Sequence, residues 1–521
     1  MDALGREIEA LKPVVGGMMI SSQCADSTKK RILIIYLLVS LGLMYLFEDE
    51  IEECLKESFG KLEAMLAGEN DLYTVCTIFW VFRTYGYNMS SDVFERFKGE
   101  NGKFKESLIE DAKGMVSLYE AAHLGTTTDY ILDEALSFTE INLESIATTK
   151  ATSPHISVRI RNALSMPQHF NAEMLFAREY ISFYEQEECH DKMLLKFSKI
   201  NFRFLQLTWI QELKTLTKWW KQYDFASKLP PYFRDRMIEC YIFAVTIYFE
   251  PRYSRARAAI CRFSTLYTII DDTCDRYASL SEVADLVHCV ERWAPDCKDS
   301  LPKYMQPVFK FAWNVFKESE REGISEEGLS FNVQGLLQEQ FKIYLRALLC
   351  FEEWAQTDVV PAFDEYLDIG GEEVTVLVSI ADTFLGLGET AREEGYKWLE
   401  SRPKYIKAHA RRGRLVNDMS GFEDDMSRGY KANSINYYMK QYGVTEEEAF
   451  SELKKMVRDL DKIVNEEFLK EATTLPREIL KRVVDIGRIV AFSYRCGEEY
   501  TNSDGRFKEH ITSLFVNLIP L

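Results

Sequence analysis

The chain has 521 residues, of which 46% are hydrophobic and 28% charged, and its formal net charge at pH 7 is −19. This composition supplies enough apolar material for a core and does not indicate intrinsic disorder. At roughly 150 residues per domain, the length predicts about three domains or two large ones. The acidic balance argues against a nucleic-acid-binding protein, which needs a concentrated basic face. A protein this acidic that handles a polyanion needs metal ions or a small local cluster of arginines.

The cysteine and histidine patterns disfavour several enzyme classes. The 11 cysteines are scattered and form no C-x-x-C pair, which is typical of reduced, buried thiols in an intracellular protein. The 7 histidines do not occur at zinc-ligand spacing, and the chain has no H-E-x-x-H, Walker loop, G-x-G-x-x-G helix start or G-x-S-x-G elbow. Zinc hydrolases, P-loop enzymes, dinucleotide enzymes and α/β-hydrolases are therefore poor candidates.

An uncharged apolar run covers residues 32–47, between a basic triplet at 29–31 and an acidic triplet at 48–50. A membrane-spanning helix needs about 20 apolar residues, and shorter runs are more often core helices. We therefore predict a buried helix and no membrane span, with peripheral membrane contact as the alternative.

Apolar residues recur at helical spacing along almost the whole chain, and alternating strand patterns are hard to find. Proline and glycine pairs at residues 230–231 and 370–371 indicate helix ends or loops. The sequence therefore predicts an all-α protein of about twenty helices or more. We expect two helical domains, 1–200 and 201–521.

The segment IIDDTCD at residues 269–275 ends an apolar helical stretch in three carboxylates. Asp271 and Asp275 are four positions apart, so on a helix they share one face about 6 Å apart along the axis. Such carboxylates repel each other unless a cation lies between them. Mg²⁺ suits this pattern, because it takes one or two carboxylates and completes its shell with water and phosphate oxygens. The alternative is a solvated acidic helix end.

A second acidic face follows in the segment NDMSGFEDD at residues 417–425. Asn417, Gly421 and Asp425 are spaced i, i+4 and i+8 and so lie on one helix face, with Asp424 near it. Asn417 and Asp425 offer oxygen ligands for a further metal ion, although a solvated acidic face is again the alternative. Two such helices facing each other would form a metal cluster for a diphosphate.

Three arginines accompany these motifs. Arg234 and Arg236 precede the first motif, and Arg414 lies about one helical turn before Asn417. Guanidinium groups match phosphate oxygens bidentately. The alternative is that they are surface arginines paired with nearby acids.

With these motifs in place, the sequence resembles the plant class I terpene synthases, in particular the sesquiterpene-type subfamily and its crucifer branch, which includes sesterterpene synthases. The resemblance covers nearly the whole chain and is carried by residues 41–55, 119–139, 248–257, 271–275, 414–430 and 437–450. It implies a C-terminal catalytic class I terpenoid synthase α-bundle and an N-terminal relict helical barrel domain without activity. The D-x-D-D motif of class II cyclisation is absent.

The resemblance also implies roles for individual residues. It implies three Mg²⁺ ions, with Mn²⁺ as an alternative metal. The implied ligands of two ions are Asp271 and Asp275, supported by Asp272, and those of the third are Asn417, the Gly421 position and Asp425. The implied diphosphate-binding residues are Arg234, Arg236 and Arg414, and the implied lid residues are Tyr500 and Asp504. Phe243 and Tyr267 are implied pocket residues, with plain helical core as the alternative.

Two departures from the family pattern concern the metal site and its cover. Gly421 stands where relatives have Ser or Thr, and Asp425 where they have Glu. A water must then replace the missing hydroxyl, and the helix must approach closer or coordinate differently. The tandem-arginine motif expected near the N-terminus is missing.

The implied activity is that of a carbon–oxygen lyase that ionises a linear prenyl diphosphate and cyclises the cation to a polycyclic hydrocarbon. Phe243, smaller than the family's tryptophan, and Gly335, expected inside a helix beside the pocket, favour the C25 substrate geranylfarnesyl diphosphate. C15 farnesyl diphosphate and a C20 substrate are alternatives, and close helix contact is the alternative explanation of Gly335. No terminal base is readable.

Two other functions stay open: a prenyl chain-elongating transferase and a catalytically dead scaffold. We expect no nucleic-acid partner, a prenyl diphosphate synthase as substrate supplier, and a monomer or weak dimer. The resemblance implies a plastid location after removal of a presequence, with the cytosol as the alternative.

Overall fold

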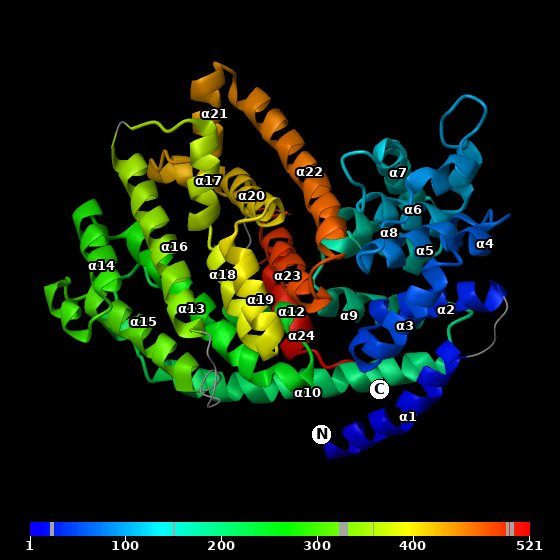
Figure 1. Ribbon diagram of the computed structural model, residues 1–521, viewed down its shortest axis with the longest axis horizontal. Coiled ribbons are helices and arrows are strands. Elements are labelled where there is room, and N and C mark those ends of the chain that lie inside the picture. The colour runs from blue at the N-terminus through cyan, green and yellow to red at the C-terminus, as the bar shows by residue number, and fades with distance from the viewer. Residues whose placement is uncertain are drawn as a thin grey trace. The chain divides into compact units, whose positions relative to one another are not determined.

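The computed structural model describes residues 1–20, 25–149, 152–321, 332–357, 359–495, 497, 500 and 505–521. These residues are almost entirely helical (Figure 1). Within these ranges there is no β-strand, although an isolated antiparallel bridge pairs Lys98 with Phe104. The chain forms two compact units. The N-terminal unit comprises Met1–Thr208, Asn465–Thr474 and Thr512–Leu521, and the C-terminal unit comprises Trp209–Val464 and Leu475–Ile511.

The N-terminal unit contains nine complete α-helices among its described residues. They are α1 (Asp2–Ile20), α2 (Ala25–Ser40), α3 (Glu48–Phe59), α4 (Leu62–Leu66), α5 (Leu72–Thr84), α6 (Ala112–Ala122), α7 (Tyr130–Thr148), α8 (Pro154–Ser165) and α9 (Glu173–Tyr184). The division between the units falls within α10 (Lys192–Lys221), α22 (Glu446–Glu471) and α24 (Arg506–Phe515).

The apolar run at residues 32–47 is buried, as predicted, but it is not one helix. Helix α2 ends at Ser40, and Gly42 adopts a positive φ of 69° before a short 3₁₀ turn at Met44–Leu46. The positive φ favours glycine at this position, and a Cβ there would lie a tight 3.0 Å from the end of the Met174 side chain. No helix in the described part of the chain combines the length and apolar character needed to span a membrane.

A buried ion pair stabilises the N-terminal unit. Arg83 of α5 donates to both carboxylate oxygens of Asp129, at 3.0 and 3.4 Å, and the Ser91 hydroxyl donates to the same carboxylate at 2.6 Å. The backbone and hydroxyl of Thr126 also donate to Asp129. Because all these donors converge on one buried acid, we expect its loss to be costly.

The C-terminal unit contains the helices that carry the predicted site. They are α11 (Phe225–Lys228), α12 (Met237–Ile247), α13 (Ser254–Arg276), α14 (Leu280–Arg292), α15 (Met305–Ser319), α16 (Val333–Gln356), α17 (Phe363–Glu373), α18 (Val376–Thr383), α19 (Glu389–Glu400), α20 (Lys404–Arg428), α21 (Ser434–Tyr442) and α23 (Arg477–Tyr494). Helix α12 packs on α13 and α23, and α20 packs on α17, α21 and α23.

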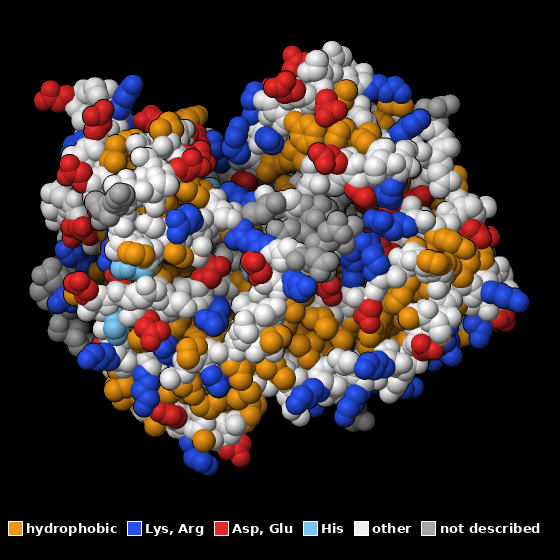
Figure 2. All heavy atoms as spheres, turned by 180° about the vertical axis from the view of Figure 1, so that it is seen from behind, with side chains coloured by type: hydrophobic (Ala, Val, Ile, Leu, Met, Phe, Trp, Pro, Cys, Tyr) orange, Lys and Arg blue, Asp and Glu red, His pale blue; other side chains and the backbone are white. Residues whose placement is uncertain are grey.

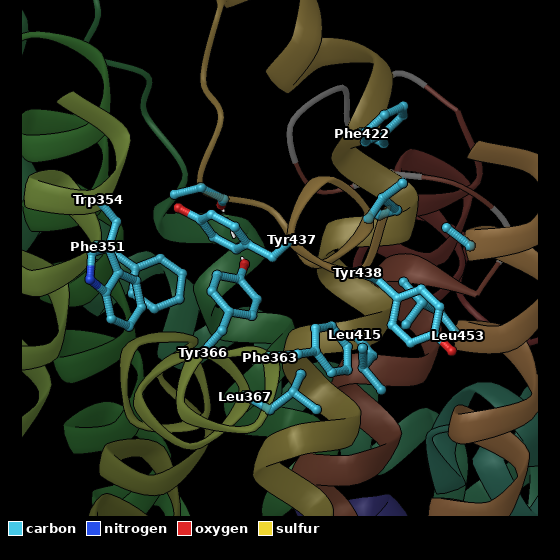
Figure 3. Packing of buried hydrophobic residues seen from close by; sticks show 13 residues of the cluster. Phe351, Trp354, Phe363, Tyr366, Leu367, Leu415, Phe422, Tyr437, Tyr438 and Leu453 are labelled. Carbon is cyan, nitrogen blue, oxygen red and sulfur yellow. Dashed lines mark hydrogen bonds between the residues drawn. The ribbon is translucent and has the colours of Figure 1, made fainter. Parts of the chain in front are cut away.

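An aromatic cluster fixes α20 among its neighbours (Figure 3). Phe351 and Trp354 of α16, Tyr366 of α17 and Tyr437 of α21 pack around it, and Leu415 of α20 belongs to the same buried cluster. The Tyr366 hydroxyl donates to the Asp418 carboxylate at 2.8 Å. This packing determines which face of α20 is turned towards α13.

Gly335 lies in a helix, as expected, but it does not line the cavity described below. Gly335 is the third residue of α16, and its amide donates to the side chain of the capping residue Asn332 at 2.9 Å. A Cβ at this position would lie 2.4 Å from Asn332 Nδ2. The glycine therefore makes room for the helix cap.

Charged side chains of both signs are interspersed over the face drawn in Figure 2.

Candidate active site

A cavity of about 260 Å³ in the C-terminal unit brings the predicted site residues together. Its walls come from α12, α13, α16, α17, α18, α20 and α23 and from the segments beside them. The predicted residues that line it are Arg234, Arg236, Phe243, Tyr267, Asp271, Asp272, Asp275, Arg414, Asn417, Gly421, Asp425 and Tyr500. Asp504 lies outside the described residues. Residues separated by more than two hundred positions thus line one cavity.

The end of α13 supplies three carboxylates with different surroundings. Asp272 is buried and paired with Arg234, whose Nη2 lies 2.7 Å from Asp272 Oδ1. Desolvation raises the pKa of Asp271 well above its ordinary value, and the carboxylates of Glu373, Asp275 and Asp272 add to the shift. Asp271 is therefore surrounded by negative charge, which the charge of Arg414 offsets only in part.

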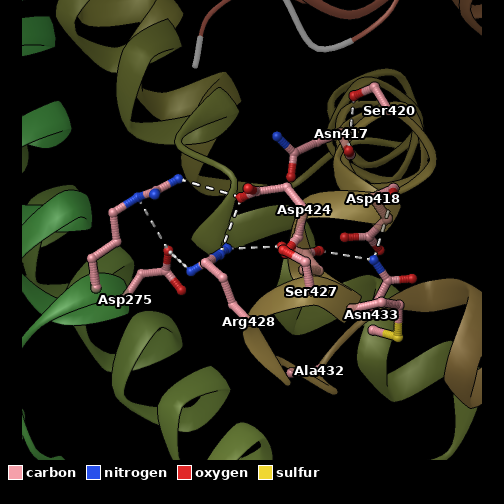
Figure 4. Close-up of polar contacts among 12 residues, drawn as sticks. Asp275, Asn417, Asp418, Ser420, Asp424, Ser427, Arg428, Ala432 and Asn433 are labelled. Carbon is pink, nitrogen blue, oxygen red and sulfur yellow. Dashed lines mark hydrogen bonds and ion pairs between the residues drawn. The ribbon is translucent and has the colours of Figure 1, made fainter. Parts of the chain in front are cut away.

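Arg428, at the end of α20, joins the two acidic motifs (Figure 4). Its guanidinium lies 3.0 Å from Asp275 Oδ2, 3.1 Å from Asp424 Oδ2 and 2.9 Å from Asp425 Oδ1. The sequence analysis missed this arginine, although the spacing of Asp424, Asp425 and Arg428 on one helix is itself a signal for pairing.

The second motif lies on the cavity-facing side of α20. Asn417 accepts a hydrogen bond from Arg414, which also pairs with Glu373 and Asp418. Asp425 accepts from Asn433 Nδ2 at 3.1 Å. A Cβ on Gly421 would lie 4.0 Å from Asp425 Oδ2, which is ordinary contact, so a larger residue fits there. The one-face arrangement predicted from the spacing is present.

Two acids in the cavity wall were not predicted. Glu352 of α16 and Glu373 of α17 both line the cavity. Burial and the charge of Asp275 raise the pKa of Glu352 to about 8, and burial raises that of Glu373 to about 7. The pKa of Asp425 is raised to about 6 by burial and by Asp418. Raised carboxyl pKa values in one cavity indicate a shortage of positive charge.

These donors fit a hard divalent cation. Within the described ranges, no three His, Cys, Asp or Glu side chains converge on one point. Mg²⁺ nevertheless suits such a site, because it binds one or two carboxylates and takes its other oxygens from water and phosphate. Asp271 and Asp275 on α13, and Asn417 and Asp425 on α20, offer only oxygen ligands.

The opposite wall is aromatic. Arg236 donates to the backbone oxygen of Tyr500, and its guanidinium lies 4.5 Å from the centre of the Tyr500 ring. The Tyr500 hydroxyl lies 2.7 Å from Thr268 Oγ1, and its ring centre is 5.3 Å from that of Phe243. Phe243 and Tyr500 thus form one aromatic wall, and Arg236 is buried behind it.

Tyr267 forms a pair with Asp382, a cavity residue that was not predicted. Tyr267 donates its hydroxyl proton to Asp382 Oδ2 at 2.6 Å, and both side chains are buried. Asp382 is the lone carboxylate of the apolar helix α18, VLVSIADT. A single acid in such a helix is a signal that sequence reasoning could have used.

The amino-acid sequence matches two protein-family models and several known relatives. Residues 221–463 match the family model "Terpene synthase family, metal binding domain", and residues 1–164 match "Terpene synthase, N-terminal domain". Terpenoid synthase 1 of Arabidopsis thaliana is 66% identical, over 100% of this chain and 85% of its own length. Alpha-barbatene synthase of the same plant is 51% identical, over 100% of this chain and 93% of its own length.

Solved structures share the fold. Isoprene synthase of grey poplar, in complex with three Mg²⁺ ions and dimethylallyl-S-thiolodiphosphate, aligns with a TM-score of 0.90 at 26% identity, covering 99% of this chain and 98% of that one. A limonene synthase structure aligns with the same TM-score at 25% identity, covering 100% and 95%. The predicted all-α, two-domain fold is confirmed.

Proposed function

The chain belongs to the terpene synthase family and is a lyase acting on prenyl diphosphates. We propose that it is a class I cyclase that ionises a linear prenyl diphosphate and closes the resulting cation into rings. The observation that supports this best is the polarity of the cavity. Acidic helices and arginines lie at one end, and aromatic and aliphatic side chains line the other.

The carboxylates of α13 and the oxygens of α20 are the proposed ligands of Mg²⁺. Asp271 and Asp275, with Asp272 beside them, would bind two ions, and Asn417 and Asp425 a third, with water in place of a side-chain oxygen at Gly421. When bound, Mg²⁺ supplies positive charge that stabilises the departing diphosphate. The family neighbour crystallised with three Mg²⁺ ions supports this count.

Arginines of the cavity wall are the proposed diphosphate-binding groups. Arg234 is partly exposed, lines the cavity and faces Asp272, so its guanidinium lies where a phosphate would bind. Arg414 is buried against Glu373 and Asp418 and positions its guanidinium at the second motif. Both would stabilise charge that develops as the carbon–oxygen bond breaks.

The apolar walls would then fold the cation and keep water away. Phe243 and Tyr500 present aromatic rings, whose faces attract positive charge. Ile486, Ile489 and Val490 of α23 complete this wall. Exclusion of water prevents early capture of the cation.

For substrate length we propose the C15 compound farnesyl diphosphate. The preference for a C25 substrate rested on the resemblance to the crucifer branch and on Gly335 and Phe243, and of these two residues only Phe243 lines the cavity. A volume of about 260 Å³ lies below the range of about 300–1,000 Å³ usual for ligand pockets. A small cavity supports the shorter chain.

Purified protein, Mg²⁺ and the linear C10, C15, C20 and C25 diphosphates test the proposal, with Asp271→Asn as the inactive control. Diphosphate release is followed together with gas chromatography of the organic extract. A cyclic hydrocarbon from the C15 substrate is expected. Fastest turnover of the C25 substrate would overturn only the proposed substrate length. A longer prenyl diphosphate as product would indicate a transferase. No turnover of any substrate would indicate a catalytically dead scaffold.

A further inference from the structure

Cyclisation of a carbocation to a hydrocarbon ends when a proton is lost to an acceptor, and no such acceptor is readable from the sequence. We propose, on the basis of the function above, that the carboxylate of Asp382 accepts this proton and that Tyr267 positions it. The inference rests on the place of the Asp382–Tyr267 pair in the cavity.

Asp382 faces the substrate cavity from the short helix α18. Val376, Ser379 and Asp382 follow one another at three-residue spacing, and all three line the cavity. Helix α18 packs on α13, where Tyr267 lies four residues before Asp271. Four residues correspond to about 6 Å along a helix, so the pair lies one turn away from the metal-binding end.

One oxygen of this carboxylate is free to take a proton. Oδ2 accepts the Tyr267 hydroxyl at 2.6 Å, whereas Oδ1 is buried and has no hydrogen-bond partner among the described residues. A buried polar atom without a partner is costly and calls for an explanation. A group delivered by the substrate supplies the missing partner.

The electrostatic surroundings suit a proton acceptor. Burial raises the pKa of Asp382 well above the ordinary value, which increases the proton affinity of its carboxylate, while the hydrogen bond from Tyr267 acts in the opposite direction and stabilises the ionised form. A cation in the cavity favours the ionised form further. The other carboxylates that line the described cavity pair with arginines or crowd together at the metal-binding end.

The step is balanced without a further reactant. A C–H bond next to the cationic carbon breaks, its electron pair forms the carbon–carbon double bond, and the proton forms an O–H bond with Oδ1 of Asp382. The positive charge of the substrate and the negative charge of the carboxylate disappear together. The proton passes to water when the hydrocarbon leaves.

Two substitutions at Asp382 separate a base from a structural group. Asp382→Asn keeps the shape and an oxygen for Tyr267 but removes the basicity, whereas Asp382→Glu keeps the basicity and changes the length. A structural role predicts that Asn preserves the products better than Glu, and a role as base predicts the reverse order. Tyr267→Phe removes the positioning hydrogen bond and leaves the carboxylate.

The measurement is the product distribution from Mg²⁺ and whichever of farnesyl and geranylfarnesyl diphosphate the wild type converts, with diphosphate release recorded in parallel. For Asp382→Asn we expect the share of the main wild-type hydrocarbon to fall about tenfold in favour of isomeric hydrocarbons or alcohols, while diphosphate release stays within about threefold. Asp382→Glu should restore part of the wild-type share, and Tyr267→Phe should lower it by a smaller factor.

An unchanged product distribution in Asp382→Asn would overturn the inference, as would better preservation by Asn than by Glu. If circular dichroism shows that Asp382→Asn does not fold, the products of Tyr267→Phe provide the test. A wild-type product distribution from Tyr267→Phe would then overturn the inference. Absence of diphosphate release from the wild type would instead refute the proposed function.

Discussion

Arg428 and Asp275 form an ion pair at 3.0 Å although 153 positions separate them in the sequence. The pair connects α20 with α13, and the same guanidinium also pairs with Asp424 and Asp425. A single protein cation thus partly neutralises the carboxylates that we propose as metal ligands. It competes with Mg²⁺ for their oxygens.

Replacing Arg428 should therefore strengthen the response to Mg²⁺. In Arg428→Gln we expect a lower melting temperature in EDTA, through loss of about 1 kcal/mol of pairing. We also expect a larger rise in melting temperature on adding Mg²⁺, because the loss of Arg428 leaves these carboxylates less neutralised. Arg292→Gln, which removes an exposed pair with Asp296 on α14, is the control. Equal Mg²⁺-induced shifts in both variants would contradict this competition.

Asp271→Asn should abolish turnover, by at least about a hundredfold, while the helical circular dichroism signal is retained. Burial raises the folded-state pKa of Asp271, so its protonated form favours folding. This contribution is fully present below the pKa of the unfolded chain and is lost as the pH rises through the folded value. At pH 8 in EDTA the variant should therefore melt no lower than the wild type. Asp285→Asn, on the exposed side of α14, should leave both properties unchanged. Full activity of Asp271→Asn would disprove its assignment as a ligand.

Gly421→Ser should lower the Mg²⁺ concentration needed for half-maximal rate, by about threefold or more, because its hydroxyl replaces a water. The space beside Asp425 accommodates the side chain. Gly421→Ala provides the matched control, since it adds the carbon without the oxygen. If Ser and Ala shift the Mg²⁺ requirement equally, the third site is built otherwise, and Asp424 becomes the next candidate ligand.

Phe243→Trp should narrow the cavity and shift the preference towards shorter substrates. We expect the kcat/KM ratio of C25 to C15 diphosphate to fall about tenfold, the scale of a few methylene groups in an apolar pocket. Gly335→Ala changes a glycine that contacts the helix cap and should leave this ratio unchanged. An equal change of the kcat/KM ratio in the Gly335 and Phe243 variants would show that the aromatic wall does not determine substrate chain length.

The buried pair in the N-terminal unit gives a stability prediction. Asp129→Asn leaves Arg83 without its partner and should lower the free energy of unfolding of that unit by about 3–5 kcal/mol. Although burial opposes it, hydrogen bonds from Ser91 and the charge of Arg83 lower the pKa of Asp129, so its contribution is present at neutral pH and is lost as the pH falls through the folded value. Urea unfolding at pH 7 and pH 4 measures this contribution to the free energy of unfolding. The double variant Arg83→Met, Asp129→Leu should lose less unfolding free energy than Asp129→Asn alone. An unfolding energy equal to that of the wild type would show that the pair contributes nothing.

Spacing along a helix was enough to predict which residues of each acidic motif share a face, because the α-helix fixes that geometry locally. The sequence could not predict that Glu352 and Glu373 join them, or that Arg428 reaches Asp275, since tertiary packing of α13, α16, α17 and α20 brings these residues together. Gly335 was misread because the start of α16 was not recognised from its capping residue, Asn332. The bend at Gly42 was missed because an apolar run contains no signal of where its helix ends.

Helix α20 carries a proposed metal-binding face and a proposed diphosphate-binding arginine on one rigid body, tied down through Asp418. That carboxylate accepts from Tyr366 at 2.8 Å and from the Ser434 amide at 2.9 Å, and it also pairs with Arg414. A sideways shift of α20 would therefore displace the proposed metal ligands and the proposed diphosphate-binding Arg414 at the same time. Substitutions on α12, α18 and α23 should therefore be tolerated. There a side chain can change shape, and with it the hydrocarbon skeleton of the product, without disturbing ionisation of the diphosphate.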